Sequence, residues 1–134
     1  MFEFHGWLAI QGSAAREDDE PDQDVLRRLV ESASGGSSLV DLRWINGELF
    51  LHVGGLLNRR SSEADEVVDL FERIGSVALG SYGVLYYRDD EKPGNDGNAF
   101  HVLAMRRGQV TEEPDGHLSP VIPRLEDPYS PEDD

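Results

Sequence analysis

The first residues of the chain alternate between two kinds of side chain. One side of an extended chain would carry Phe2, Phe4, Gly6, Leu8 and Ile10, and the other side Glu3, His5, Trp7 and Ala9. Because successive side chains of a strand point to opposite faces, this period of two predicts a strand over residues 2–10 with one face in the core. The charged residues 12–22 that follow predict a solvent-exposed loop.

Two segments show the three- and four-residue apolar spacing of amphipathic helices. For the first, over residues 23–34, Asp22 is placed to cap the start and Gly35-Gly36 to end the helix in the left-handed conformation. The second begins at Ser61 or Ser62, with Asp65 completing a capping-box-like start. The apolar stripes of the two helices are Val25, Leu26, Leu29, Val30 and Ala33, and Ala64, Val67, Val68, Phe71, Ile74 and Ala78.

Between the two helices, residues 39–45 and 48–53 predict a β-hairpin. They are separated by Asn46-Gly47, a pair that tolerates the positive φ angles of a type I′ turn. In that register one face carries Val40, Leu42, Trp44, Leu49, Leu51 and Val53, and the other face Asp41, Arg43, Phe50 and His52. We expect Gly54-Gly55 to end the hairpin.

The rest of the chain predicts two further strands and an extended end. The strands cover residues 82–88 and 98–106, and a polar loop over residues 89–97 joins them. Residues 118–125 contain two prolines, which predicts either an edge segment or an extended strap along the domain. Residues 126–134 are acidic without an apolar pattern, and we expect a mobile tail.

This order of elements predicts a single α+β domain over residues 1–125. Its mainly antiparallel sheet would carry both amphipathic helices on one face, in a ferredoxin-like split βαβ arrangement with an added strand. The uncovered face would then present His5, Trp7, Arg43, Phe50 and His52.

The charge and composition narrow the classes of partner. Among 134 residues, 12 Lys and Arg stand against 27 Asp and Glu, which gives a net charge of −15. This charge disfavours direct binding to nucleic acid or to a membrane and favours a basic protein partner. The chain has no cysteine, so disulfides and thiolate metal sites are excluded. The first residues show no signal peptide and no membrane anchor, which predicts a cytoplasmic protein.

Candidate binding residues come from the uncovered face and from the loop after residue 87. Three histidines, His5, His52 and His101, fall in predicted strands, so a metal or general-base site competes with a role as hydrogen-bonded scaffolding. Trp7 is a candidate aromatic anchor for a protein, unless the strap over residues 118–125 covers it. The predicted partner-binding residues are His5, Trp7, Tyr86, Arg88, Asp89, Asp90 and Glu91, with Tyr86 expected to be more exposed than Tyr82 and Tyr87.

Motifs that mark catalysis are missing from the sequence. It contains no phosphate-binding glycine loop, no nucleophile elbow, no His-Glu pair at zinc spacing and no calcium-binding EF-hand spacing. We therefore predict no catalytic residue, no metal ion and no cofactor, and a non-enzymatic protein. The oligomeric state stays open.

Four short segments in order carry a resemblance to a known family. They are residues 2–7, the Asn46-Gly47 hairpin with Leu51-His52-Val53-Gly54-Gly55, residues 80–86 with 88–91, and residues 118–120 with 122–123 and 126–127. With these segments the chain resembles the immunity protein 7 family of bacterial polymorphic toxin systems, nearly from end to end. The resemblance implies an antidote that binds and neutralises the toxin domain of a neighbouring gene. Nucleases are among such toxins, and the negative charge suits a basic one.

Two alternatives remain open at this point. A small-molecule or metal-binding module would use the uncovered sheet face, and its histidines would be the ligands. A mimic of nucleic acid would use the same negative charge to act on host proteins instead of a toxin.

Overall fold

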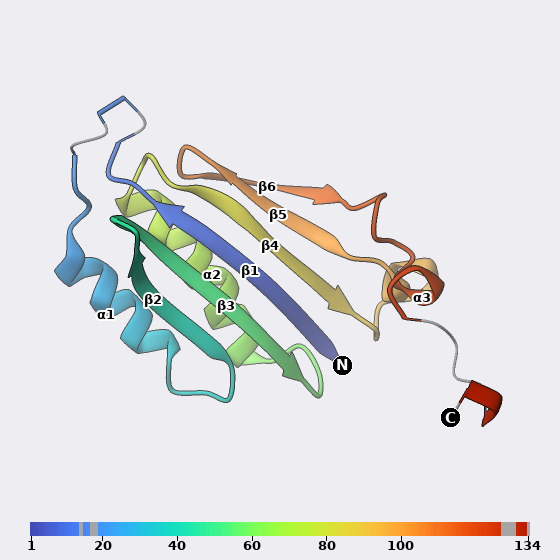
Figure 1. The fold of residues 1–134 in the computed structure, drawn as a ribbon. Coiled ribbons are helices and arrows are strands. Elements are labelled where there is room, and N and C mark those ends of the chain that lie inside the picture. Colours follow the sequence, from blue (N-terminus) through green and yellow to red (C-terminus); the bar gives the residue numbers. More distant parts are fainter. Residues whose placement is uncertain (14, 17–18, 127–130, 134) are drawn as a thin grey trace.

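The computed structural model describes residues 1–13, 15–16, 19–126 and 131–133 and shows one antiparallel sheet with helices on one side (Figure 1). The strands lie in the order β2-β3-β1-β4-β5-β6. Their bounds are β1 Phe2–Ile10, β2 Leu39–Ile45, β3 Glu48–Leu57, β4 Tyr82–Asp89, β5 His101–Arg106 and β6 Gln109–Pro114. Helix α1 spans Gln23–Ala33 and helix α2 spans Ser62–Val77.

The arrangement of the first four strands confirms the ferredoxin-like prediction. Strand β3 lies between β1 and β2 and is antiparallel to both, which is the split βαβ unit. Two strands are added beyond β4, however, where the sequence predicted one. The second of them, β6, follows a tight turn at Arg107 and Gly108, whose φ angles are both positive.

The hydrophobic core fills the space between the sheet and the two helices. Phe2, Phe4 and Leu8 of β1 are buried there, as the alternation in the sequence predicted. The stripes of both helices face the same space, through Leu26, Val30, Ala33, Ala64, Val67, Leu70, Phe71 and Ile74. The central strands β1, β3 and β4 therefore give alternate residues to the core and leave the others on the opposite face.

The starts and ends of the helices differ in part from the prediction. Asp22 caps α1 as expected, because its carboxylate accepts hydrogen bonds from the backbone N–H groups of residues 24 and 25 at 3.1 and 3.3 Å. The predicted left-handed glycine stop is wrong, since neither Gly35 nor Gly36 has a positive φ. Instead, the Ser34 N–H donates to the Glu31 carbonyl at 3.3 Å. Ser61 caps α2 without a side-chain hydrogen bond.

The hairpin forms as predicted, but the glycines after it do not end it. Asn46 and Gly47 have φ angles of 51° and 83°, as a type I′ turn requires. Gly54 and Gly55 lie inside β3, opposite His5 and Phe4 of β1. At Gly55 a Cβ atom would lie 2.5 Å from Cζ of Phe4, so the ring of Phe4 occupies the space that a side chain would need.

The segment after β6 is neither an edge strand nor an extended strap along the domain, because it forms a short helix beyond the ends of β4 and β5 (Figure 1). Its short helix α3 spans Val121–Arg124 and packs beside the 3-10 turn η1, Gly94–Asn98, where Asn98 exchanges two hydrogen bonds of 3.0 Å with the backbone of Ile122. Of the predicted tail, residues 127–130 and 134 lie outside the described residues, and Pro131–Asp133 form the turn η2. No helix in the described part of the chain is long and apolar enough to cross a membrane.

Candidate functional site

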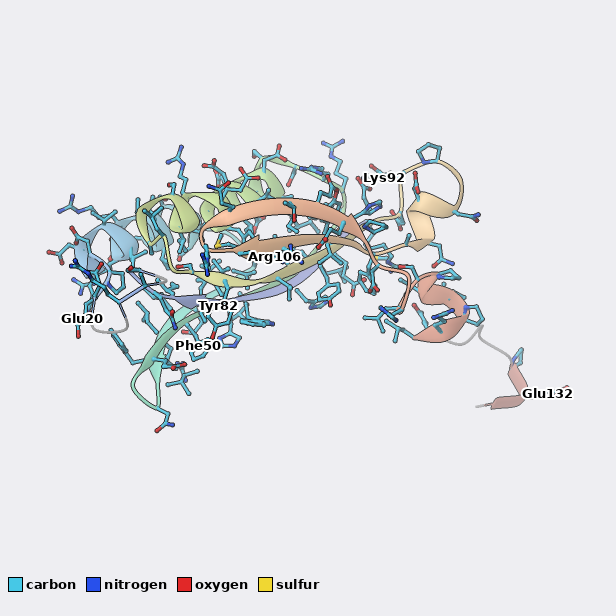
Figure 2. All side chains as sticks on the ribbon, turned by 90° about the horizontal axis from the view of Figure 1, so that it is seen from above. Glu20, Phe50, Tyr82, Lys92, Arg106 and Glu132 are labelled. Atoms are coloured by element: carbon cyan, nitrogen blue, oxygen red, sulfur yellow. The ribbon has the colours of Figure 1, made fainter. Side chains whose placement is uncertain are left out.

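The sheet face that points away from α1 and α2 is the candidate binding surface, and we call it the open face. Figure 2 shows Phe50 and Tyr82 on this side of the sheet, away from both helices. The pairing registers place on it the following residues: Glu3, His5, Trp7, Asp41, Arg43, Phe50, His52, Tyr82, Val84, Tyr86, Arg88, Val102 and Arg106. The sequence predicted five of them, His5, Trp7, Arg43, Phe50 and His52, to share this face.

Aromatic side chains gather at the centre of the open face. Trp7 is 38% exposed and meets Tyr82, which is 44% exposed, in an edge-to-face contact with ring centroids 6.1 Å apart. On the neighbouring strand β3, His52 lies opposite Trp7, and the ring centroid of His52 is 6.1 Å from that of Phe50. Exposed Trp and Tyr side chains on a rigid sheet are typical of the residues that carry most of the energy in protein interfaces.

The segment of residues 118–125 does not cover Trp7, which was the competing expectation. Its hydrogen bonds go to Asn98 and to Phe100, at the start of β5, where the Phe100 N–H donates to Ser119 Oγ at 2.7 Å. Figure 1 shows α3 beyond the ends of β4 and β5. The aromatic centre therefore stays accessible to a partner.

Tyr82 is a candidate that the sequence prediction missed. Tyr86 was expected to be the more exposed of the two, but it is half-buried, with its ring 6.0 Å from that of Phe100. Both tyrosines occupy even positions of β4 and so share the open face. The alternation along β4 predicts that Tyr82 and Tyr86 share a face, but the position of Tyr82 beside Trp7 depends on the register, in which Ala9 pairs with Tyr82 and Trp7 with Val84.

A chain of polar contacts occupies the other end of the open face. His5 Nε2 lies 3.0 Å from the carboxylate of Glu3, and that carboxylate lies 3.3 Å from Arg88 Nη2. Arg88 is buried, whereas His5 is exposed. The Glu3 carboxylate neutralises Arg88, so the main role of this guanidinium is to link β1 and β4 and not to bind a partner.

The three acidic residues that follow Arg88 differ in burial and in their contacts within the chain. Asp89 is 8% exposed, and its Oδ1 accepts a hydrogen bond of 3.1 Å from the Glu91 N–H. Asp90 is exposed and forms an ion pair with the α-amino group of Met1. Glu91 is exposed and has no ion-pair partner among the described residues. Of this predicted loop, Asp90 and Glu91 thus offer carboxylates to a partner, while Asp89 shapes the turn.

The three strand histidines do not come together. His101 pairs with Tyr87 in the register and lies on the core side, stacked on the Tyr87 ring at 5.1 Å, whereas His5 and His52 lie on the open face. Within the described ranges, no group of three or more His, Asp or Glu side chains is arranged to hold a metal ion. The histidines therefore give no support to a metal centre.

Tyr87 is held in its protonated form on the core side of the sheet. Burial, together with a hydrogen bond from its hydroxyl to the Glu112 carboxylate, raises the pKa of Tyr87 to about 12. The side chains of Arg60 and Lys92 lie over the ring, 5.8 and 5.2 Å from its centroid. This cluster joins β4, β5 and β6 to Arg60 in the loop before α2 and to Lys92 in the loop after β4, and it lies on the core side and not on the open face.

The structure is an α+β domain whose antiparallel sheet is covered by helices on one side and carries exposed aromatic side chains on the other. The sequence matches the family model described as immunity protein 7 over residues 1–127. The chain therefore belongs to the immunity protein 7 family, and this membership implies an immunity protein directed against a toxin. No curated protein and no solved structure matches the chain.

Proposed function

We propose that this immunity protein binds a basic toxin domain of the nuclease class in the cytoplasm and blocks it by covering its active surface, without catalysing a reaction. The observation that carries the proposal is the aromatic centre of the open face. Trp7 and Tyr82 remain exposed there although both helices pack on the opposite side. A stable protein interface buries about 800 Å² on each partner, and an uncovered sheet supplies a surface of that kind.

Within this proposal, the predicted contact residues take different roles. His5, Trp7 and Tyr86 contact the toxin from the open face, and Asp90 and Glu91 contact it from the loop at the end of β4. Arg88 and Asp89 keep that loop in place, because both are buried and bonded within the chain. Trp7 is the main anchor, since a large aromatic side chain contributes much apolar area at little conformational cost.

The net charge of −15 supports a basic partner. Most charges of the open face are already paired, as in the contacts of Asp41 with Arg43 at 3.2 Å and of Glu113 with Arg106 at 3.3 Å. Unpaired carboxylates of the described residues also lie away from it, for example Glu66 and Glu72 on α2, which packs on the opposite side of the sheet. Charge therefore acts on the approach of the toxin, and aromatic contacts hold it.

The test is co-expression of the chain with the C-terminal domain of the protein encoded beside its gene. We expect growth rescue and a complex that survives purification, and we expect Trp7→Ala to weaken the complex. Leu79→Ala serves as the matched control, because Leu79 is also exposed but lies in the turn after α2. Absence of both rescue and complex, with a toxin domain that does kill the cell, would contradict the proposal.

The charge argument has its own measurement. Raising the salt concentration should slow association of the chain with the toxin and leave dissociation nearly unchanged, because screening acts on charges at long range. An association rate that does not depend on salt would remove the basic partner from the proposal and leave inhibition itself intact.

A further inference from the structure

A cleft opens at the end of the sheet that lies away from Arg88. It is formed by the β2–β3 hairpin turn, the end of β1 with residues 11–13, and residues 19–21 before α1, and its volume is about 450 Å³. Ile10 and Leu49 form its apolar part, Trp44 forms a wall, and Asp19, Glu20 and Glu48 lie around it. We call it the Trp44 cleft.

Trp44 is 47% exposed although its register puts it on the core side of the edge strand β2. It also lines a second, smaller cavity of about 180 Å³ beside the first turn of α1, together with Leu26. The start of α1, through Gln23, Leu26 and Arg27, therefore borders this cavity while about half of Trp44 remains exposed. A large aromatic surface left free next to a cleft is available to a ligand.

The carboxylates around the cleft have no partners within the described part of the chain. Asp19, Glu20 and Glu48 form neither an ion pair nor a side-chain hydrogen bond there. Other exposed acidic side chains do, for example Asp65 with Arg60 at 3.1 Å and Asp69 with Arg73 at 2.9 Å. Three unneutralised negative charges beside one indole favour a positively charged ligand.

The wall that carries two of these carboxylates is fixed by close packing. A Cβ atom at Gly12 would lie 2.5 Å from the Asp19 carbonyl oxygen. The backbone of Asp19 therefore comes closer to position 12 than any residue with a side chain at that position would allow. The Asp19 N–H also donates to the Arg16 carbonyl at 3.2 Å. The fold therefore holds this part of the loop against the end of β1.

The chemistry of the cleft selects among cations. The described acidic residues form no group arranged to hold a metal ion. An aromatic face beside carboxylates is instead suited to a guanidinium group, which stacks on indole through its plane and donates paired hydrogen bonds from its edge. An ammonium group lacks that plane.

We propose that the Trp44 cleft binds an arginine side chain of the protein partner, with the guanidinium on the indole of Trp44 and its N–H groups donating to Glu20 and Glu48. This inference rests on the proposed function, which supplies a basic protein as partner. The open face and the Trp44 cleft would then engage the same partner, since Ala9 and Leu49 at the edge of the cleft are neighbours of Phe50 and Tyr82 in the sheet.

The test needs no toxin. The chain has 2 tryptophans, so the indole N–H region of a ¹H–¹⁵N spectrum contains one signal each for Trp7 and Trp44, which Trp7→Phe assigns. The chain is titrated at low ionic strength with the peptide acetyl-Gly-Arg-Gly-amide. We expect a saturable shift of the Trp44 signal and none of the Trp7 signal. The same peptide with citrulline in place of arginine keeps the shape without the charge and should cause no shift.

Two double variants separate the cleft from general charge attraction. Glu20→Gln with Glu48→Gln should weaken peptide binding about tenfold, equivalent to about 1.4 kcal/mol. Glu66→Gln with Glu72→Gln removes the same charge from the exposed face of α2 and should leave the affinity unchanged. Equal weakening in both variants, no shift of the Trp44 signal, or an equal shift with citrulline would each overturn the proposal. None of these outcomes bears on toxin rescue, so failure of the cleft and failure of the immunity function are distinguished.

Discussion

Replacing Trp7 by alanine tests the role of the aromatic centre, and its magnitude follows from the exposure of the side chain. A tryptophan presents about 250 Å² of surface, and 38% of it, about 95 Å², remains for a partner to cover. At about 25 cal/mol per Å² of apolar area this surface contributes about 2.4 kcal/mol, so the complex should dissociate about 50-fold faster. The association rate should change little, because the charge of the chain does not change.

The toxin domain is bound to a surface and the variant is passed over it in flow. This binding measurement gives the association and dissociation rate constants separately. Thermal unfolding of Trp7→Ala alone shows whether the fold persists, and we expect it to, since the indole lies outside the core between the sheet and the helices. Leu79→Ala, at a position that is 61% exposed, should leave both rate constants unchanged. A folded Trp7→Ala protein that dissociates less than about threefold faster would refute the placement of Trp7 in the interface, since about 50-fold is expected from its area.

Three further predictions concern the fold. Gly55→Ala should lower the free energy of unfolding in urea by about 1–3 kcal/mol, because the new methyl group meets the buried ring of Phe4, which has no room to move. Asp22→Ala should cost about 1 kcal/mol in the same assay, since two N–H groups of α1 lose their acceptor, whereas Asp22→Asn should restore most of it. Tyr87 should titrate near pH 12 in the ultraviolet spectrum of the folded chain. This pKa exceeds the unfolded value of 10.0, so the protonated hydroxyl stabilises the fold below pH 10. That stabilisation is lost as the pH rises through about 12. Tyr87→Phe should abolish that titration, and a spectrum in which all 4 tyrosines titrate together near pH 10 would contradict the assignment.

The parts of the fold that were predictable from sequence are those set by local periodicity and turn chemistry. The alternation from Phe2 to Ile10 gives the correct core face of β1, and the Asn46-Gly47 pair gives the correct register of β2 with β3. Strand β6 was missed because Val110 is its single apolar residue with a packing role, and because an edge strand needs no alternating pattern. Its turn is also unusual, since Arg107 adopts a positive φ without being Asn or Gly.

Glycine signals were harder to interpret than apolar ones. A pair of glycines marks a helix end, a hairpin end or a close approach equally well in the sequence. Gly55 belongs to the last kind, and the ring that lies over it comes from Phe4, a residue distant in the chain. Only the tertiary pairing of β1 with β3 decides between these roles.

For the candidate site, the face was predictable but the pairing of its charges was not. The period of two assigned His5, Trp7, Phe50 and His52 to one side of the sheet. The burial of Arg88 against Glu3 depends on the register between β1 and β4, which the sequence does not reveal. Trp44 was expected to belong to the core because of its parity, yet it remains 47% exposed at the edge strand, beside the first residues of α1.

The alternation along the strands separates the residues that pack the core from the residues that form the open face. Along β1, Phe4 and Leu8 determine stability while His5 and Trp7, their immediate neighbours, face the other way. Substitutions in the second set therefore leave the packing of the first almost untouched. Under the proposed function, a library randomised only at open-face positions would change the specificity for the toxin while keeping one scaffold, so antidotes for different toxins would not require a redesigned core.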